Sequence, residues 1–209
     1  MGRLVIVITS LAIAGVLASA AQARPAVTRS RFVTASASWS TTKQLAGGDS
    51  RRTEWYVDVS QGHGEESNSF LARLVMRCHG TGDAQECRKT SRLAGSGDVS
   101  GQAFALNPAR RMAARLDATY NLQPYDVQGH PLGPPRPTRF VARWTGTGRI
   151  DRARDIESHR DRCEFSRSVT VTDTQPAQAR ATVGGKVLGK SSDASVGVGR
   201  RTGVERRTC

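Results

Sequence analysis

The sequence predicts an all-β fold, an antiparallel β-sandwich of about nine short strands, with a closed up-and-down barrel as the alternative. Three observations support this class. Apolar and polar residues alternate with a period of two in most segments from residue 32 onward. Short clusters that contain Gly, Pro or Asp separate these segments. No segment keeps the apolar period of a helix.

The N-terminal half contains four of these strands. In 33–40, Val, Ala, Ala and Trp form one face, and Thr and Ser form the other. In 54–59, Trp, Val and Val form one face, and Glu, Tyr and Asp form the other. In 70–78, Phe, Ala, Leu, Met and Cys form one face, and Leu, Arg, Val and Arg form the other. The short apolar run 103–106 is a weaker candidate.

The remaining strands follow the same rule. In 112–120, Met, Ala, Leu, Ala and Tyr alternate with Arg, Asp and Thr, and in 140–144 Phe, Ala and Trp share a face. Shorter alternations predict strands at 165–171, 179–183 and 196–198. Many of the inward positions are Ala, so we expect a thin core that depends on disulfides for part of its stability.

Turn chemistry separates the strands. The expected turns lie at 47–49, 62–64, 95–98, 129–131 and 174–176. The proline-rich segment 123–137 predicts a stiff, extended crossover between sheets. The segment 149–167 mixes Arg, Asp and Glu densely, which is typical of a solvated surface.

Residues 1–23 have the three parts of a secretory signal peptide. Arg3 supplies a positive charge, an apolar run extends from Leu4 to Leu17, and small residues lead to Ala23. We expect cleavage after Ala23. An uncleaved membrane anchor is the alternative, because the apolar run is close to the length that spans a bilayer.

After cleavage, we expect the mature chain to consist of a flexible N-terminus, 24–31, and a single β-rich domain, 32–209. No other apolar stretch is long enough to cross a membrane, so we expect no membrane span after cleavage. The predicted location is therefore secreted, either extracellular or at the cell surface.

The chain is strongly basic. It has 31 Lys+Arg against 18 Asp+Glu, a formal net charge of +13, and 27 of the basic residues are Arg. This charge favours anionic partners such as an envelope polymer, with an extracellular protein as a further possibility. The alternative is that the arginines reflect codon usage and are spread over solvated strand faces.

Four cysteines in an exported chain predict two disulfides. We expect Cys78–Cys87 to close a local loop, and Cys163–Cys209 to hold the C-terminus. Metal binding by Cys and His residues is disfavoured, because the chain lacks the close Cys and His spacings of zinc sites.

One stretch, 184–191, fits the phosphate-loop pattern G-x-x-x-x-G-K-[ST]. A phosphate loop needs a helix after it, and the residues that follow are strand-like and contain glycine. We therefore interpret 184–191 as a β-hairpin with Lys186 and Lys190 in solvent, and we expect no nucleotide and no cofactor.

No catalytic set can be assembled from the sequence. His63 and His130 lie beside glycines in expected turns, and no nucleophile elbow or His-Glu-x-x-His motif is present. Asp155, Glu157 and His159 could form an acid–base pair, but they equally suit a surface charge network. The catalytic prediction is therefore none.

The candidate anion-binding residues are Arg200, Arg201, Arg206 and Arg207, near the C-terminus. The alternative is an edge strand whose charges prevent aggregation. The sequence thus favours a non-enzymatic binding or envelope-associated protein. A small secreted hydrolase or protease inhibitor is the second hypothesis.

Overall fold

The computed structural model describes residues 25–63, 67–80, 85–109 and 111–207. Within these residues nearly everything is antiparallel β-structure, which confirms the predicted fold class. The strands are β1 (Ala26–Gln44), β2 (Ser50–His63), β3 (Asn68–His79), β4 (Glu86–Ser96), β5 (Phe104–Asn107), β6 (Ala113–Tyr125), β7 (Arg136–Gly146), β8 (Asp151–Arg160), β9 (Glu164–Val183), β10 (Lys186–Lys190) and β11 (Asp193–Arg207). A 3-10 turn, Ala46–Gly48, joins β1 to β2 at one of the predicted turns.

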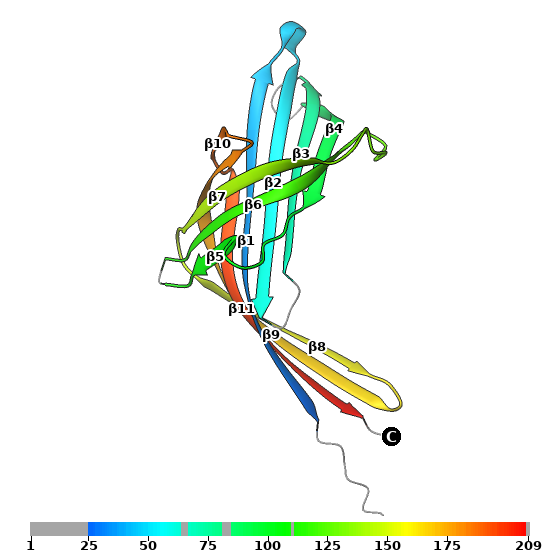
Figure 1. Ribbon diagram of the computed structural model, residues 1–209, viewed down its shortest axis with the longest axis vertical. Helices are drawn as coiled ribbons and strands as arrows, with labels where there is room; N and C mark the ends of the chain where they lie inside the picture. The colour runs from blue at the N-terminus through cyan, green and yellow to red at the C-terminus, as the bar shows by residue number, and fades with distance from the viewer. Residues whose placement is uncertain (1–24, 64–66, 81–84, 110, 208–209) are drawn as a thin grey trace, which may run out of the picture.

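The strands form one sheet that closes into a ring (Figure 1). Strands β1 to β4 pair consecutively, β4 pairs β6, and β6 pairs β7. Strand β7 then pairs the C-terminal part of β9, from Phe140↔Val183 to Gly146↔Ala177. Because β9 also pairs β11, and β11 pairs β1, the ring of hydrogen-bonded strands is complete.

Strand β9 changes partners in its middle. Residues up to Pro176 pair β11, and residues from Ala177 onward pair β7. Proline has no N–H to donate to a ladder, so it fits the position where one partner strand is exchanged for another. The turn predicted at 174–176 is therefore wrong, and the two strands expected on either side of it form one long strand.

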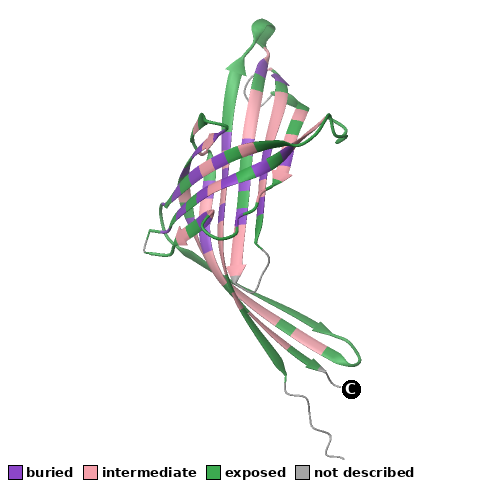
Figure 2. Cartoon of the chain, viewed as in Figure 1, coloured by how far each residue is buried: buried purple, intermediate pink, exposed green. Residues whose placement is uncertain are grey.

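The buried residues lie along the strands of the ring (Figure 2), and the largest of them are aromatic. The ring of Phe140 makes edge contacts with Trp39 and Tyr120, at centroid distances of 5.9 and 6.0 Å. Trp144 Nε1 donates to the carbonyl of Ser36 at 2.9 Å, which satisfies its polar atom. Small residues complete the core as predicted, including the buried Ala35, Ala37, Ala114, Ala118 and Ala142.

A buried glutamine lies where β9 changes partners. Gln175 is 2% exposed; its Oε1 accepts a hydrogen bond from Met112 N at 2.9 Å, and its Nε2 donates to Gly148 O at 3.0 Å. A Cβ on Gly146 would lie 2.1 Å from Gln175 Oε1, so only glycine allows this close approach. Gln175 therefore links β9 to the residues that precede β6 and follow β7.

Four strands continue beyond the ring, at the bottom of Figure 1. We call this part the projecting sheet: β8, with residues 26–33 of β1, 164–173 of β9 and 198–207 of β11, in the order β8-β9-β11-β1. Residues 26–31, expected as a flexible N-terminus, belong to β1 because they pair β11 from Ala26↔Glu205 onward. The predicted signal peptide 1–23 lies outside the described residues.

The proline-rich segment is not a crossover between sheets. It ends β6, forms a loop and begins β7, and these two strands are neighbours in the ring. Asp126 fixes the loop, because its Oδ1 accepts hydrogen bonds from Gln128 N and His130 N at 2.9 and 2.8 Å.

One predicted disulfide, Cys78–Cys87, is confirmed and joins β3 to β4. The second, Cys163–Cys209, stays a prediction because Cys209 lies outside the described residues. The register supports it: β11 ends with Arg207 opposite Glu164, the residue that follows Cys163.

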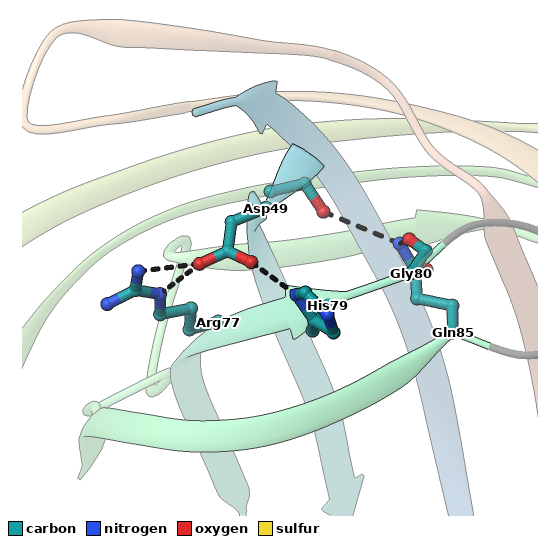
Figure 3. A network of polar contacts seen from close by, with 6 residues as sticks. Asp49, Arg77, His79, Gly80 and Gln85 are labelled. Atoms are coloured by element: carbon teal, nitrogen blue, oxygen red, sulfur yellow. Dashed lines mark hydrogen bonds and ion pairs between the residues drawn. The ribbon is translucent and has the colours of Figure 1, made fainter. Parts of the chain in front are cut away.

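A polar network fastens the opposite end of the ring, beside the disulfide (Figure 3). Asp49 Oδ2 accepts from Arg77 Nε at 2.7 Å, and Asp49 Oδ1 lies 2.7 Å from His79 Nδ1. The hydrogen bond to His79, and then that to Arg77, hold the pKa of Asp49 below its usual value. The network ties the start of β2 to the end of β3.

This network predicts an acid-sensitive contribution to stability. A carboxyl whose pKa is lowered by folding stabilises the fold above its unfolded pKa of about 4, and the contribution disappears as the pH falls through the lowered value. Asp49→Asn should therefore lower the thermal midpoint at pH 7 and lower it by a smaller amount at pH 2. Thermal unfolding followed by circular dichroism between these pH values measures both. Asp151→Asn, at an exposed position of β8, is the control, and an equal loss for Asp49→Asn at both pH values would contradict this account.

Candidate functional site: the arginine face of the projecting sheet

The two faces of the projecting sheet follow from the strand register. In β1, the odd-numbered residues from Ala35 to Trp39 point into the ring. The same side continues along β1 through Val33 and Arg31 to Arg29. Cross-strand pairs extend this side over β11, β9 and β8, because paired residues of an antiparallel sheet share a face.

This side, which we call the arginine face, is strongly basic. Eight arginines lie on it, and all are exposed: Arg29, Arg31, Arg152, Arg154, Arg160, Arg167, Arg200 and Arg206. Among the described residues of this face, Asp173 is the one acid. The charge comes from all four strands, so it belongs to the sheet and not to one segment of the chain.

One arginine of this face is neutralised. Arg152 donates to both oxygens of Asp173, Nε to Oδ1 at 2.6 Å and Nη2 to Oδ2 at 2.9 Å. These hydrogen bonds are the main reason that the pKa of Asp173 is lowered, and the nearby charge of Arg200 adds to the effect. The ion pairs found among the described residues include none of the other seven arginines.

Apolar side chains occupy the positions between the arginines. They are Val27, Val33, Ile156, Phe165, Val169, Val171, Val198 and Val204. Ile156 is 46% exposed and Val27 53%, whereas the others are partly buried. The arginine face therefore presents guanidinium groups above an apolar floor, a combination that can grip phosphate or carboxylate groups bidentately.

The opposite face has a different character. It carries Ser, Thr and Gly on β9 and β11, and the acidic residues Asp151, Asp155, Glu157, Glu164 and Glu205. A Cβ on Gly199 would lie 2.1 Å from Phe32 Cζ, so this glycine makes room for the Phe32 ring. Negative charge is thus segregated from the arginine face by the alternation of the strands.

The structure separates the four arginines that the sequence singled out. Arg200 and Arg206 lie on the arginine face. Arg201 lies on the opposite face, where its Nε donates to Ser168 Oγ at 2.8 Å and its Nη2 lies 3.3 Å from Glu157 Oε2. Arg207 ends β11 opposite Glu164, and its side chain lies outside the described part of the chain. Two of the four therefore share the candidate site.

The sequence did not reveal the other arginines of the face, which are Arg29, Arg31, Arg152, Arg154, Arg160 and Arg167. They are distributed over three strands, and only the pairing of those strands places them together. The sequence does contain one sign of this face: Arg29 and Arg31 are two positions apart, as are Arg152 and Arg154. Residues two positions apart in a strand point to the same side.

The phosphate-loop pattern forms a β-hairpin, as predicted. Gly184 and Gly185 make the two-residue turn between β9 and β10, with φ of 52° and 82°, which glycine adopts without strain. Lys186 and Lys190 are exposed, and β11 follows where a phosphate loop requires a helix.

Two of the three acid–base candidates of β8, Glu157 and His159, line a shallow groove on the opposite face, and Asp155 is not among its lining residues. This groove has a volume of about 720 Å³ and includes Glu157, His159 and Arg201. Glu157 binds Arg201, as expected of a surface charge network. Within the described residues no group of three or more His, Cys, Asp or Glu is arranged to hold a metal ion. In the same part of the chain, no helix is long and apolar enough to cross a bilayer.

Comparison of the chain with family models, with curated proteins and with solved structures found no significant match.

Proposed function

We propose that this protein is exported and binds an anionic polymer of the cell envelope through its arginine face, without catalysis. One observation carries the proposal: seven exposed arginines on one face have no ion-pair partner among the described residues. A two-dimensional array of guanidinium groups suits a chain of repeated phosphate or carboxylate groups, because each group can be bound bidentately.

The shape of the molecule supports this proposal. The side chains inside the ring form a buried core, and Gln175 hydrogen-bonds to Met112 and Gly148 at its edge, so the ring supplies rigidity to the sheet that projects from it. The projecting sheet extends from the ring and consists of exposed and partly buried residues (Figure 2), and the eight arginines of its arginine face are exposed. A long polymer can lie along such a face without entering a pocket.

Binding to polyphosphate at different salt concentrations tests the proposal. Each arginine–phosphate contact releases counterions, so the logarithm of affinity should fall linearly with the logarithm of salt concentration, with a slope on the order of −5 if all seven arginines take part. Fluorescence anisotropy with labelled polyphosphate measures the slope, and neutral dextran is the control polymer. Binding that does not depend on salt, or equal binding to dextran, would refute the proposal.

Export has its own test. Expressed with its N-terminus intact in a secreting host, the mature protein should begin at Arg24 and carry two disulfides. Intact-mass analysis should show a rise of about 4 Da on reduction, 2 Da for each bridge. A protein that retains residues 1–23, or that shows four free thiols after export, would contradict this part of the proposal.

A further inference from the structure

A pocket lies at the root of the arginine face, where the projecting sheet meets the ring. Its volume is about 380 Å³. Val33, Val171 and Val198 contribute apolar lining from three neighbouring strands, and Pro108 adds to it from the loop after β5. The charged residues that line it are Arg31, Arg152, Asp173 and Arg200.

Two of these arginines form a pair of like charges. Arg31 of β1 and Arg200 of β11 are directly opposite in the strand register, on the same face. Like charges in such a cross-strand pair destabilise a sheet. Both side chains are exposed, and no acid among the described residues forms an ion pair with either of them. An anion bound between the two guanidinium groups would remove this repulsion.

The one carboxylate at the pocket is already engaged. Both oxygens of Asp173 accept hydrogen bonds from Arg152. Asp173 therefore lowers the potential near Arg200 but does not bridge Arg31 and Arg200. The pocket keeps a net positive charge that a small anion can neutralise.

The apolar lining of the pocket limits the size of the substituent that a bound anion can have. Val33, Val171 and Val198 are partly buried, and the next inward position of β9 after Asp173 is filled by the buried, hydrogen-bonded Gln175. A short apolar group can cover these valines, whereas a long chain has no interior to enter. The ligand should therefore combine one anionic group with a short apolar substituent.

We infer that this pocket binds a phosphate monoester with a short alkyl or aryl group. The phosphate bridges Arg31 and Arg200, and the apolar group packs on Val33, Val171 and Val198. This inference rests on the proposed function, because it assumes that the arginine face recognises anions. It adds a single binding site with a defined class of ligand.

Titration calorimetry with phenyl phosphate and with inorganic phosphate tests the inference. Phenyl phosphate should bind with one-to-one stoichiometry and about tenfold more tightly than inorganic phosphate, because its ring covers apolar surface. Arg31→Gln/Arg200→Gln should abolish this binding, whereas Arg88→Gln/Arg143→Gln, on exposed positions of the ring, should leave it unchanged. Val198→Ser should reduce the preference for phenyl phosphate, and thermal melting verifies that each variant is folded.

Equal affinity for the two phosphates, or unchanged binding in the Arg31→Gln/Arg200→Gln variant, would overturn the inference. Polyphosphate binding measured on the same samples separates the two proposals. If polyphosphate binds and phenyl phosphate does not, the pocket inference alone is wrong. If phenyl phosphate binds as described and polyphosphate does not, the pocket inference stands and the proposed function is wrong.

Discussion

Replacement of Phe140 by alanine should destabilise the protein by about 3–5 kcal/mol, the range for truncating a buried aromatic side chain. Phe140 is fully buried and contacts both Trp39 and Tyr120 through ring edges. It also lies on β7, the strand whose pairing with β9 closes the ring. The cavity would thus form where β7 pairs β9 and closes the ring, and the surrounding strands cannot collapse without loss of hydrogen bonds.

Urea unfolding followed by tryptophan fluorescence measures this loss. Val187→Ala is the matched control, because Val187 is an apolar residue of β10 that is 76% exposed, and we expect a change within about 0.5 kcal/mol. A loss below about 1 kcal/mol for Phe140→Ala would contradict a well-packed core inside the ring.

The second large effect concerns polymer binding. The triple variant Arg29→Gln/Arg167→Gln/Arg206→Gln removes three unpaired arginines from three different strands of the arginine face. Each charge near an anionic surface contributes about 1 kcal/mol, so the affinity for polyphosphate should fall about 100-fold at moderate salt. The salt slope should become less steep by about two to three.

A variant with the same net charge decides whether position matters. Arg88→Gln/Arg136→Gln/Arg143→Gln removes three exposed arginines from β4 and β7 of the ring. If binding depends only on the net charge of the protein, the two triple variants should weaken it equally. If the arginine face is the site, the ring variant should retain most of the affinity and the original slope.

The buried strands were predictable from the sequence because burial imposes alternation. Residues 33–40 and 140–144 each present one face to the core, and their predicted inward residues are buried except Val33, which is partly buried. Strands β4 and β8 were not predicted, because β8 is exposed on both faces and β4 on most of its length. A strand without a buried face has no apolar period to detect.

The candidate site was only partly predictable, for a different reason. Charge density at the C-terminus indicated Arg200 and Arg206, but density alone could not separate them from Arg201 on the opposite face. Arg31 and Arg200 come from opposite ends of the sequence and meet only because β1 pairs β11. This pairing is non-local, and no local pattern encodes it. The change of partner at Pro176 was missed because a proline among polar residues usually marks a turn.

Chemical footprinting of arginines tests the central claim most directly. Phenylglyoxal modifies exposed guanidinium groups, and mass spectrometry reports the extent at each arginine with and without polyphosphate. We predict protection of the unpaired arginines of the arginine face, which are Arg29, Arg31, Arg154, Arg160, Arg167, Arg200 and Arg206. Arg88, Arg136 and Arg143 on the ring should react equally in both samples. Equal protection of both groups, or protection of the ring alone, would contradict the assignment of the arginine face as the binding surface.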